Sequence, residues 1–464
     1  MKRRIFIRQT AATIAGTGIF SGIIQSCIKN SEVGQQHANE ISEAGTQKSV
    51  LIIGAGAAGL VAASFLKSNG INVTILEAAE TYGGRIKKLE SFADFPIEVG
   101  AEYIHGKNTS WYKWNVEYGA QFVNYTPKDF YSLDGILKSE KQVSNDVDVK
   151  KAWAFEKSID KFSGSDKSFL DYEIEQQIPE RVRHIVNADF GNDWGTSDEF
   201  LSVAGVAEED NAWTAGLNDY LVKNYNYIDL LNHKCSNILP FIKTNSKVVS
   251  INYEAALLKV TDNSGNHYKA DKILITVPLS ILQKQIIDFA PTLPQWKIDA
   301  INNIRMGNGM KIILSFKKRF WDKNLRYIYG DLVPIYWYTS IQKGNSHVIT
   351  AFVMGNAATY LSSLGSNATN TVLQELDSYY TNAATPNFLA AHIEDWTLNP
   401  NILGSYSSPI VNGGGLQTRF NLYKNINNKI FFAGEAAHFK GHNSTVHGAV
   451  ETGLWASADI INNW

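Results

Sequence analysis

The stretch that decides the fold of this chain is residues 49–59, which read SVLIIGAGAAG. Five residues without a charge, four of them apolar, predict a buried parallel strand. A helix-period segment at 60–67 follows the glycines, and a second apolar run at 73–76 ends at Glu77. Strand, glycine-rich turn, helix and strand in this order predict a βαβ unit of a Rossmann-like domain in a mixed α/β fold.

The glycine-rich turn has the spacing of a dinucleotide site. Gly54 suits a tight turn, Gly56 lets backbone approach a pyrophosphate, and Gly59 lets helix and strand pack closely. Ala58 lies in the same turn, where the N-terminus of the helix offers unpaired N–H groups to phosphates. Glu77 follows Gly54 by 23 residues and is placed to accept from ribose hydroxyls. The sequence therefore predicts that a dinucleotide binds here.

Length and composition exclude several classes of function for this protein. The 464 residues suggest two or three domains, and 43 basic against 45 acidic residues give a formal charge of −2, so no global charge favours nucleic acid. Aromatic residues make up 12% and charged residues 19%, which is typical of a globular chain. Only two cysteines, Cys27 and Cys235, are present, too few for a disulfide framework or a cysteine-based metal site, and we predict no metal centre.

The N-terminus has the pattern of an export signal. Arg3 and Arg4 open a basic patch, and the mostly apolar run at 11–24 is too short for a membrane span. The patch resembles a twin-arginine signal, and the residues before Cys27 resemble a lipoprotein cleavage box that would make this cysteine an acylated first residue. We predict a signal at 1–27, a flexible linker at 28–48, and a periplasmic or membrane-anchored lipoprotein. The alternative is an ordinary cleaved secretory signal with an incidental cysteine.

Four further segments carry a family resemblance. Residues 77–85 read EAAETYGGR, residues 98–106 read EVGAEYIHG, residues 430–435 read IFFAGE, and residues 443–453 read NSTVHGAVETG. On these motifs the chain resembles the flavin-dependent amine oxidase family, which includes monoamine oxidases, polyamine oxidases and histone lysine demethylases. The resemblance implies that the dinucleotide is FAD.

The resemblance also implies how FAD is held. Ser405 stands where monoamine oxidases carry their flavin-linking cysteine, so noncovalent binding is expected. A helix that begins after Ser444 or Thr445 would aim its positive end at the flavin O2. By pattern alone, Arg85 would be a surface loop residue. The resemblance implies flavin contacts beyond the glycine-rich turn at Gly84, Arg85, Gly100, Ala101, Glu102, Val249, Gly434, Glu435, Thr445 and Val446.

Four residues are candidates for the chemistry. Lys311 lies in a G-x-G-x-K run before an apolar strand, and in the family this lysine holds a water against flavin N5 that promotes reaction with oxygen. Its pattern alone would fit a solvated surface lysine. Tyr406 matches one wall of the family's aromatic cage, and Thr445 stands where monoamine oxidases carry the second wall. His105 and Glu102 are expected to contact the substrate amine, with a loop-stabilising hydrogen-bonded pair as the alternative.

The predicted function is FAD-dependent oxidation of an amine. Hydride transfer to flavin N5 would give an imine, then an aldehyde and ammonia or a smaller amine, while O2 becomes H2O2. An L-amino-acid oxidase would need a cation for the substrate carboxylate, and residues 102–105 offer no arginine. An FAD-dependent dehydrogenase or desaturase and a non-catalytic flavin-binding protein remain alternatives. The oligomeric state is not predicted.

The resemblance implies that an FAD-binding domain is built from three separated segments, with a mixed sheet and helices inserted as a substrate-binding domain. The FAD-binding domain would comprise 49–109, 213–285 and 400–464, and the substrate-binding domain 110–212 and 286–399. Residues 248–251 and 272–278 predict strands. Residues 110–212 are poorly patterned apart from a helical stretch at 173–186.

Overall fold

A computed structural model describes residues 48–464 of the chain. The predicted export signal at 1–27, including Cys27, and nearly all of the predicted linker lie outside the described residues. Within 48–464, no helix combines the length and the apolar character that crossing a bilayer requires.

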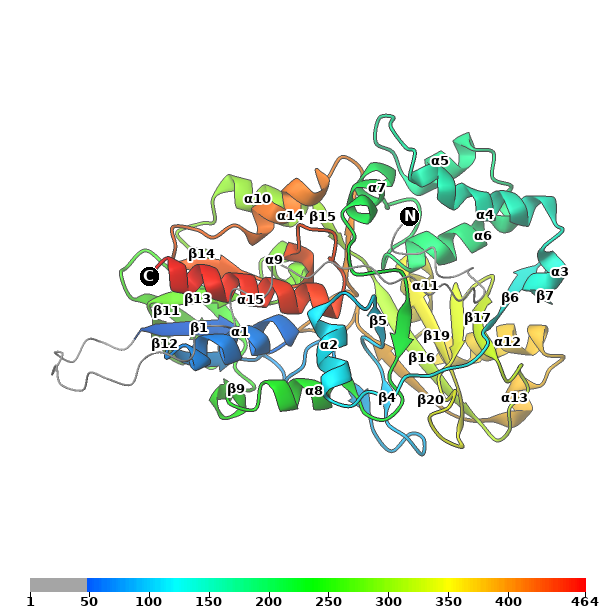
Figure 1. Cartoon of the computed structure of the whole chain (residues 1–464), viewed down its shortest axis with the longest axis horizontal. Coiled ribbons are helices and arrows are strands. Elements are labelled where there is room, and N and C mark those ends of the chain that lie inside the picture. Colours follow the sequence, from blue (N-terminus) through cyan, green and yellow to red (C-terminus); the bar gives the residue numbers. More distant parts are fainter. Residues whose placement is uncertain (1–47) are drawn as a thin grey trace, which may run out of the picture.

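The glycine-rich turn belongs to a five-stranded parallel sheet, as the sequence predicts (Figure 1). In spatial order its strands are β22 (Ile430–Phe432), β13 (Lys272–Ile275), β1 (Ser49–Ile53), β2 (Asn72–Leu76) and β9 (Ile242–Lys243). Helix α1 (Ala57–Ser68) connects β1 to β2. The central strand β1 therefore pairs with β2, the next strand in sequence, and with β13, which lies about half the chain away.

Strand β1 divides its side chains between two cores, because successive residues of a strand face opposite sides. Val50 and Ile52 join the core under α1 and the long C-terminal helix α15 (Val446–Asn462), whereas Leu51 and Ile53 join the core on the other face. Helices α1 and α15 lie side by side. The same core takes in helices α2 (Ser110–Glu117) and α8 (Tyr227–Lys234).

A four-stranded sheet covers the other face of the parallel sheet. Its spatial order is β12 (His267–Ala270), β11 (Leu258–Asp262), β10 (Val248–Asn252) and β14 (Asp288–Ala290). Helices α9 (Leu279–Gln283), α10 (Gln295–Asn302) and α14 (Gly415–Tyr423) contribute to the core behind it. These elements enclose the parallel sheet between a helical layer and a second sheet.

The second half of the molecule is built on a seven-stranded mixed sheet, at the right of Figure 1. Its spatial order is β20 (Phe388–Asp395), β16 (Gly309–Phe316), β19 (His347–Met354), β18 (Ile335–Tyr338), β17 (Leu325–Tyr329), β6 (Lys128–Leu133) and β7 (Ile136–Ser139). One core packs it against α4 (Val147–Ile159), α5 (Phe169–Glu175), α6 (Glu180–Asn187) and α7 (Val203–Asn211). Another core packs it against α11 (Gly355–Ser363), α12 (Ala368–Tyr379) and α13 (Ala384–Asn387).

Three short two-stranded pairs complete the strands described here. They are β3 (Lys88–Leu89) with β4 (Ile97–Glu98), β5 (Tyr103–His105) with β8 (Asp219–Leu221), and β15 (Ile304–Met306) with β21 (Ser407–Pro409). The short helix α3 (Glu140–Val143) follows β7. Of these pairs, β15–β21 connects a segment predicted for the substrate-binding domain with one predicted for the FAD-binding domain.

Two predicted elements differ in extent. The helix predicted at 173–186 is two helices, α5 and α6, because Gln177 adopts a left-handed φ of 56° and Pro179 cannot continue a helix. The strand predicted at 272–278 ends at Ile275, and Pro278 precedes α9. The mixed α/β fold itself is confirmed, while the predicted domain boundaries stay predictions.

Candidate active site

A cavity of about 330 Å³ lies between the glycine-rich turn and the seven-stranded sheet. Residues from both halves line it, so the cavity is formed where the two halves meet. Of the predicted site residues, these line it: Gly54, Gly56, Ala58, Glu77, Gly84, Arg85, Gly100, Ala101, Glu102, His105, Lys311, Tyr406, Gly434, Glu435, Thr445 and Val446. The fold thus gathers the predicted site from segments more than 300 residues apart.

The glycine-rich turn forms a cradle for a phosphate-bearing ligand. Gly54 has φ of 103°, and Gly56 is the N-cap of α1, with no side chain capping the N–H groups behind it. A Cβ on Gly56 would meet no atom within 4 Å, so the backbone here is open to the cavity. A Cβ on Gly59 would lie 2.1 Å from the Gly54 carbonyl oxygen, and only glycine permits this approach of helix to turn. These features fit the pyrophosphate of FAD.

Glu77 is fixed at the end of β2 by the turn itself. Its carboxylate accepts the N–H of Ala55 at 2.8 Å and the N–H of Ala79 at 2.9 Å. Burial raises the pKa of Glu77, and these backbone N–H groups oppose that shift. The carboxylate lines the cavity, at the place where a Rossmann-type site contacts ribose.

The glycine pair that follows Glu77 holds Arg85 against the C-terminal segment. The Gly83 N–H donates to the Ala55 carbonyl at 2.9 Å, which ties this loop to the glycine-rich turn. Arg85 donates to Oε1 of Glu435 at 2.9 Å and to the Ser405 carbonyl at 2.6 Å. Burial would raise the pKa of Glu435, but the Arg85 charge and the Ser407 hydroxyl outweigh burial and lower it. Glu435 is therefore an ionised, fixed group of the cavity wall.

The N-terminus of α15 points at the same wall. Thr445 is its N-cap, and its hydroxyl accepts the Gly448 N–H at 2.9 Å, which confirms one of the two predicted caps. The Ser444 N–H donates to Oε2 of Glu435 at 3.0 Å. Because Ser444, Thr445 and Val446 line the cavity, the positive end of the helix dipole faces the ligand.

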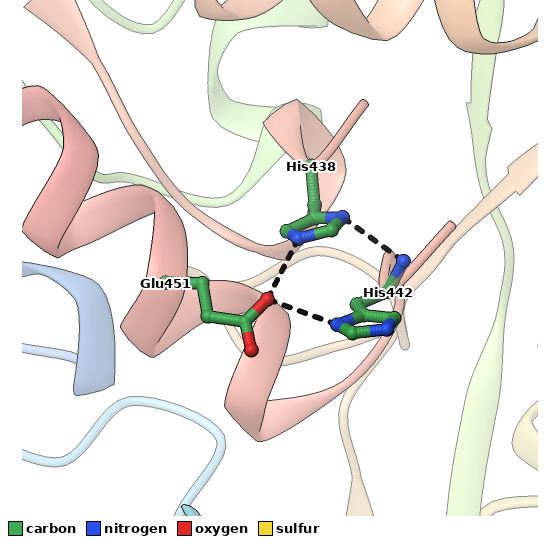
Figure 2. Close-up of side chains that lie close together, drawn as sticks. All are labelled: His438, His442 and Glu451. Carbon is green, nitrogen blue, oxygen red and sulfur yellow. Dashed lines mark hydrogen bonds and ion pairs between the residues drawn. The ribbon is translucent and has the colours of Figure 1, made fainter. Parts of the chain in front are cut away.

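A cluster of two histidines and a glutamate supports this helix end (Figure 2). Oε2 of Glu451, on α15, lies 2.9 Å from Nε2 of His438 and 2.9 Å from Nδ1 of His442. Burial lowers the pKa of His438 to about 4, despite the partly compensating charge of Glu451. The cluster ties the loop before α15 to the helix's second turn.

The three residues also offer ligand atoms within 4.8 Å of one another, the arrangement that a metal ion uses. The tautomer of His438 argues against that use. Its Nδ1 accepts the N–H of His442 at 2.9 Å, so the ring proton sits on Nε2 and faces Glu451. A metal ion could bind Nε2 only after this hydrogen-bonded proton had left. The geometry favours a hydrogen-bonded support over a metal centre.

Lys311 is buried in an ion pair. It is the third residue of β16, its side chain is 3% exposed, and its Nζ lies 3.0 Å from Oε2 of Glu102 and 3.0 Å from the Glu98 carbonyl. The same Nζ lies 4.9 Å from the ring centre of Trp337. Burial would raise the pKa of Glu102, but the charges of Lys311 and Lys343 lower it. Lys311 is therefore not a solvated surface lysine, as its sequence pattern alone would suggest. The carboxylate of Glu102 is paired with both Lys311 and Lys343.

His105 and Asp219 form a dyad at the cavity. Strands β5 and β8 place them opposite each other, and Nδ1 of His105 lies 2.7 Å from Oδ1 of Asp219. With Nδ1–H donated to the carboxylate, Nε2 of His105 is left as a proton acceptor. Both side chains line the cavity. This pair has the composition of a general base with its orienting carboxylate.

Aromatic side chains make up the rest of the wall on the sheet side. The Tyr406 hydroxyl donates to the Asp193 carbonyl at 3.0 Å, which fixes its ring at the cavity. The rings of Trp337 and Phe352 have centres 5.0 Å apart, and Tyr103 meets Trp337 edge-on at 5.7 Å. Such a wall excludes water and accepts an apolar chain.

Two predicted cofactor contacts do not line the cavity. Gly59 packs between helix and turn, as its spacing predicts, whereas Val249 lies in β10, where its neighbour Val248 lines the cavity instead. Alternate strand residues face opposite sides, and β10 has a register shift between Val248 and Ser250. Residues that sequence reasoning missed are Asp189, Asn192, Asp193, Asp219, Tyr327, Tyr329, Trp337 and Phe352. No local sequence motif marks these residues, because strand pairing and the positions of helix ends bring them to the cavity wall.

Comparisons with known proteins agree with this site. Residues 241–461 match the family model described as flavin containing amine oxidoreductase, and residues 52–121 match an NAD(P)-binding Rossmann-like domain. Probable polyamine oxidase 4 of Arabidopsis thaliana is 26% identical, with 89% of this chain and 86% of the relative covered. Lysine-specific histone demethylase 2 of Homo sapiens is 28% identical, with 89% and 53% covered.

Solved structures show the same fold. A double mutant of putrescine oxidase aligns with a TM-score of 0.78 at 18% identity and covers 90% of this chain and 99% of its own. Cyclohexylamine oxidase from Brevibacterium oxydans aligns with a TM-score of 0.76 at 18% identity, with the same coverage. Over residues 241–461 the chain is similar to the flavin containing amine oxidoreductases, and with the relatives and the cavity this match supports an enzyme that binds FAD noncovalently and oxidises amines.

Proposed function

We propose that the enzyme is an oxidase of di- or polyamines that passes the electrons to O2. The observation that supports this proposal is that one cavity is lined by the glycine-rich turn, the buried Lys311 and the His105–Asp219 dyad. When bound, FAD supplies the acceptor for a hydride from the carbon next to the amine nitrogen.

The dyad prepares the amine. An alkylammonium ion must lose a proton before its nitrogen can donate electron density to the breaking C–H bond. Nε2 of His105 is placed to accept that proton, while Asp219 stabilises the imidazolium that forms. Glu102 is committed to two lysines, so its predicted contact with the substrate stays a prediction.

The aromatic wall positions the neutral amine. Tyr406 is held by its hydroxyl, and Trp337 packs against Phe352, so the rings are fixed before substrate arrives. Fixed apolar surfaces on the cavity wall orient the substrate and keep water from the reacting carbon. Residue 445 is a threonine that caps α15, so it supplies no aromatic ring to pair with Tyr406.

Carboxylates on the cavity wall, apart from the one paired with His105, favour a second cation on the substrate. Asp189 and Asp193 both line the cavity. Opposite charges in a partly desolvated cavity attract strongly, so a chain with a distal ammonium gains binding energy that a monoamine lacks. The names of the relatives, polyamine oxidases and putrescine oxidase, agree with this substrate class.

The cavity disfavours an L-amino-acid oxidase. Among the described residues that line it, Arg85 is the arginine, and Glu435 and the Ser405 carbonyl already bind its guanidinium. Two lysines also line the cavity: Lys311 is paired with Glu102, and Lys247 lies directly before β10. A substrate carboxylate would therefore meet Asp189 and Asp193 without an uncommitted arginine to balance it.

A peroxide-coupled assay tests the proposal. The panel contains monoamines, diamines, polyamines and L-amino acids at matched concentration. We expect peroxide from diamines and polyamines with the highest kcat/KM. Peroxide from amino acids alone would contradict the substrate class, and flavin reduction without peroxide would point to a dehydrogenase. In Lys311→Met, we expect amine to reduce the flavin while its reoxidation by O2 slows.

We propose further that the protein is exported and anchored by a lipid on Cys27. The twin arginines at 3–4 and the small-residue run before Cys27 support this, together with the chemistry of a folded, cofactor-loaded enzyme. Intact-mass measurement of the native protein should find a chain that starts at Cys27 and carries acyl groups. A chain that starts at Met1 would refute the proposal.

A further inference from the structure

Lys343 is a buried lysine beside the Lys311–Glu102 pair, and the chemistry above does not use it. Its side chain is 7% exposed, and its Nζ lies 3.5 Å from Oε1 of Glu102. Lys311 binds the other oxygen, Oε2, at 3.0 Å. One buried carboxylate therefore faces two ammonium groups.

The turn that carries Lys343 is pinned by two distant segments. It connects β18 to β19, and the backbone N–H of Asn124 donates to Oε1 of Gln342 at 3.1 Å. Asp94 accepts two backbone N–H groups of the same turn, at 2.7 and 3.0 Å. The side-chain and backbone donors of this turn lower the pKa of Asp94 to about 2, so its carboxylate is ionised and holds the turn at neutral pH. The position of Lys343 is thus set by the surrounding chain as well as by Glu102.

The pairing leaves an excess of positive charge. Glu102 with Lys311 alone would be a neutral pair, and Lys343 adds one charge to it. The buried Glu98 interacts electrostatically with both Lys343 and Glu102. Burial raises the pKa of its carboxyl group to about 7. Below that pH Glu98 is mainly protonated and does not cancel the excess.

We propose that Lys343 is a positioning residue for Lys311: it shares Glu102 with Lys311 and so keeps a net positive charge at the wall of the FAD cavity. A positive charge held there stabilises negative charge that develops on a bound flavin. The inference rests on the proposed role of Lys311, and it adds a second lysine to the residues that set the charge of this wall.

Sulfite binding to the oxidised holoenzyme, measured below pH 7 where Glu98 is mainly protonated, tests the charge directly. Sulfite adds its electron pair to the flavin N5 and gives an anionic adduct, so its affinity reports nearby positive charge and needs neither amine nor oxygen. For Lys343→Met we expect the sulfite Kd to rise about fivefold, the order of effect of removing one nearby charge from a partly screened site. Lys343→Arg should restore the wild-type Kd, because it restores the charge.

The matched control is Lys128→Met, which removes a lysine from an exposed ion pair with Asp322. It should leave sulfite binding unchanged. Wild-type affinity in Lys343→Met, or a loss that Lys343→Arg fails to restore, would overturn the proposal. Should Lys343→Met not load FAD, Lys343→Gln makes the same loss of charge and keeps a donor for Glu102. Since amine turnover is not involved, failure of the amine oxidase assay is distinguishable from failure here.

Discussion

Replacing Glu98 with glutamine should make the stability of the protein less dependent on pH. The Glu98 side chain is buried, and its Oε1 accepts the N–H of Tyr227 at 2.7 Å. Burial is the largest influence on this carboxyl and raises its pKa from 4.5 to about 7, despite the opposing effects of Tyr227 and Lys343.

The direction in which pH changes the free energy of unfolding depends on whether the native or the unfolded chain holds the proton on Glu98. Below the ordinary pKa of 4.5, native and unfolded chains both bind it. Between 4.5 and about 7 the unfolded chain releases the proton while the native protein keeps it, so rising pH destabilises the fold. Above this window the full cost is present, about 3 kcal/mol for a shift of this size. Glu98→Gln removes that cost, and the amide can still accept from Tyr227.

Chemical unfolding with saturating FAD measures this effect. We expect the difference in unfolding free energy between Glu98→Gln and wild type to move in favour of the variant by about 3 kcal/mol from about pH 4 to about pH 8. Glu90→Gln, at an exposed position near β3, is the control and should show no such trend. A difference that stays constant across this range would refute the reasoning.

Three further changes test other parts of the site. Gly59→Ala should yield protein with little FAD, because its Cβ would lie 2.1 Å from the Gly54 carbonyl oxygen; the flavin-to-protein absorbance ratio reports this, and full loading would contradict it. His105→Ala should slow anaerobic flavin reduction by amine ~10²-fold near neutral pH. That loss should shrink at high pH, where the amine is already neutral, and a loss that persists there argues against a base. Glu451→Gln should lower stability by about 2 kcal/mol through its two imidazole contacts, whereas EDTA should leave the wild-type melting temperature unchanged. A fall on chelation would indicate a metal ion at this cluster.

Local pattern predicted the nucleotide half well. The run at 49–59 predicted β1, the turn and the start of α1, since the spacing of glycines and apolar residues reports backbone geometry directly. The helix cap at Thr445 could also be predicted from the sequence, because a hydroxyl residue directly before an amphipathic helix commonly accepts a backbone N–H of its first turn. The break between α5 and α6 was also readable at Pro179, although the helical period masked it.

The substrate side could not be predicted in the same way. Asp219 meets His105 only because β5 and β8 pair across 114 residues, and Lys343 meets Glu102 across 241. The local sequence around an acidic or basic residue does not indicate which distant side chain it will contact. Their partners are set by sheet topology, which a single sequence specifies only through the whole fold.

The most direct test of the account is the spectrum of the purified, folded protein. It should be yellow, with about one FAD released per chain on denaturation. Anaerobic addition of the best diamine or polyamine should bleach the flavin bands, and admission of air should restore them with formation of peroxide. Protein that remains colourless after reconstitution with FAD, or a bound flavin that no amine bleaches, would contradict the account.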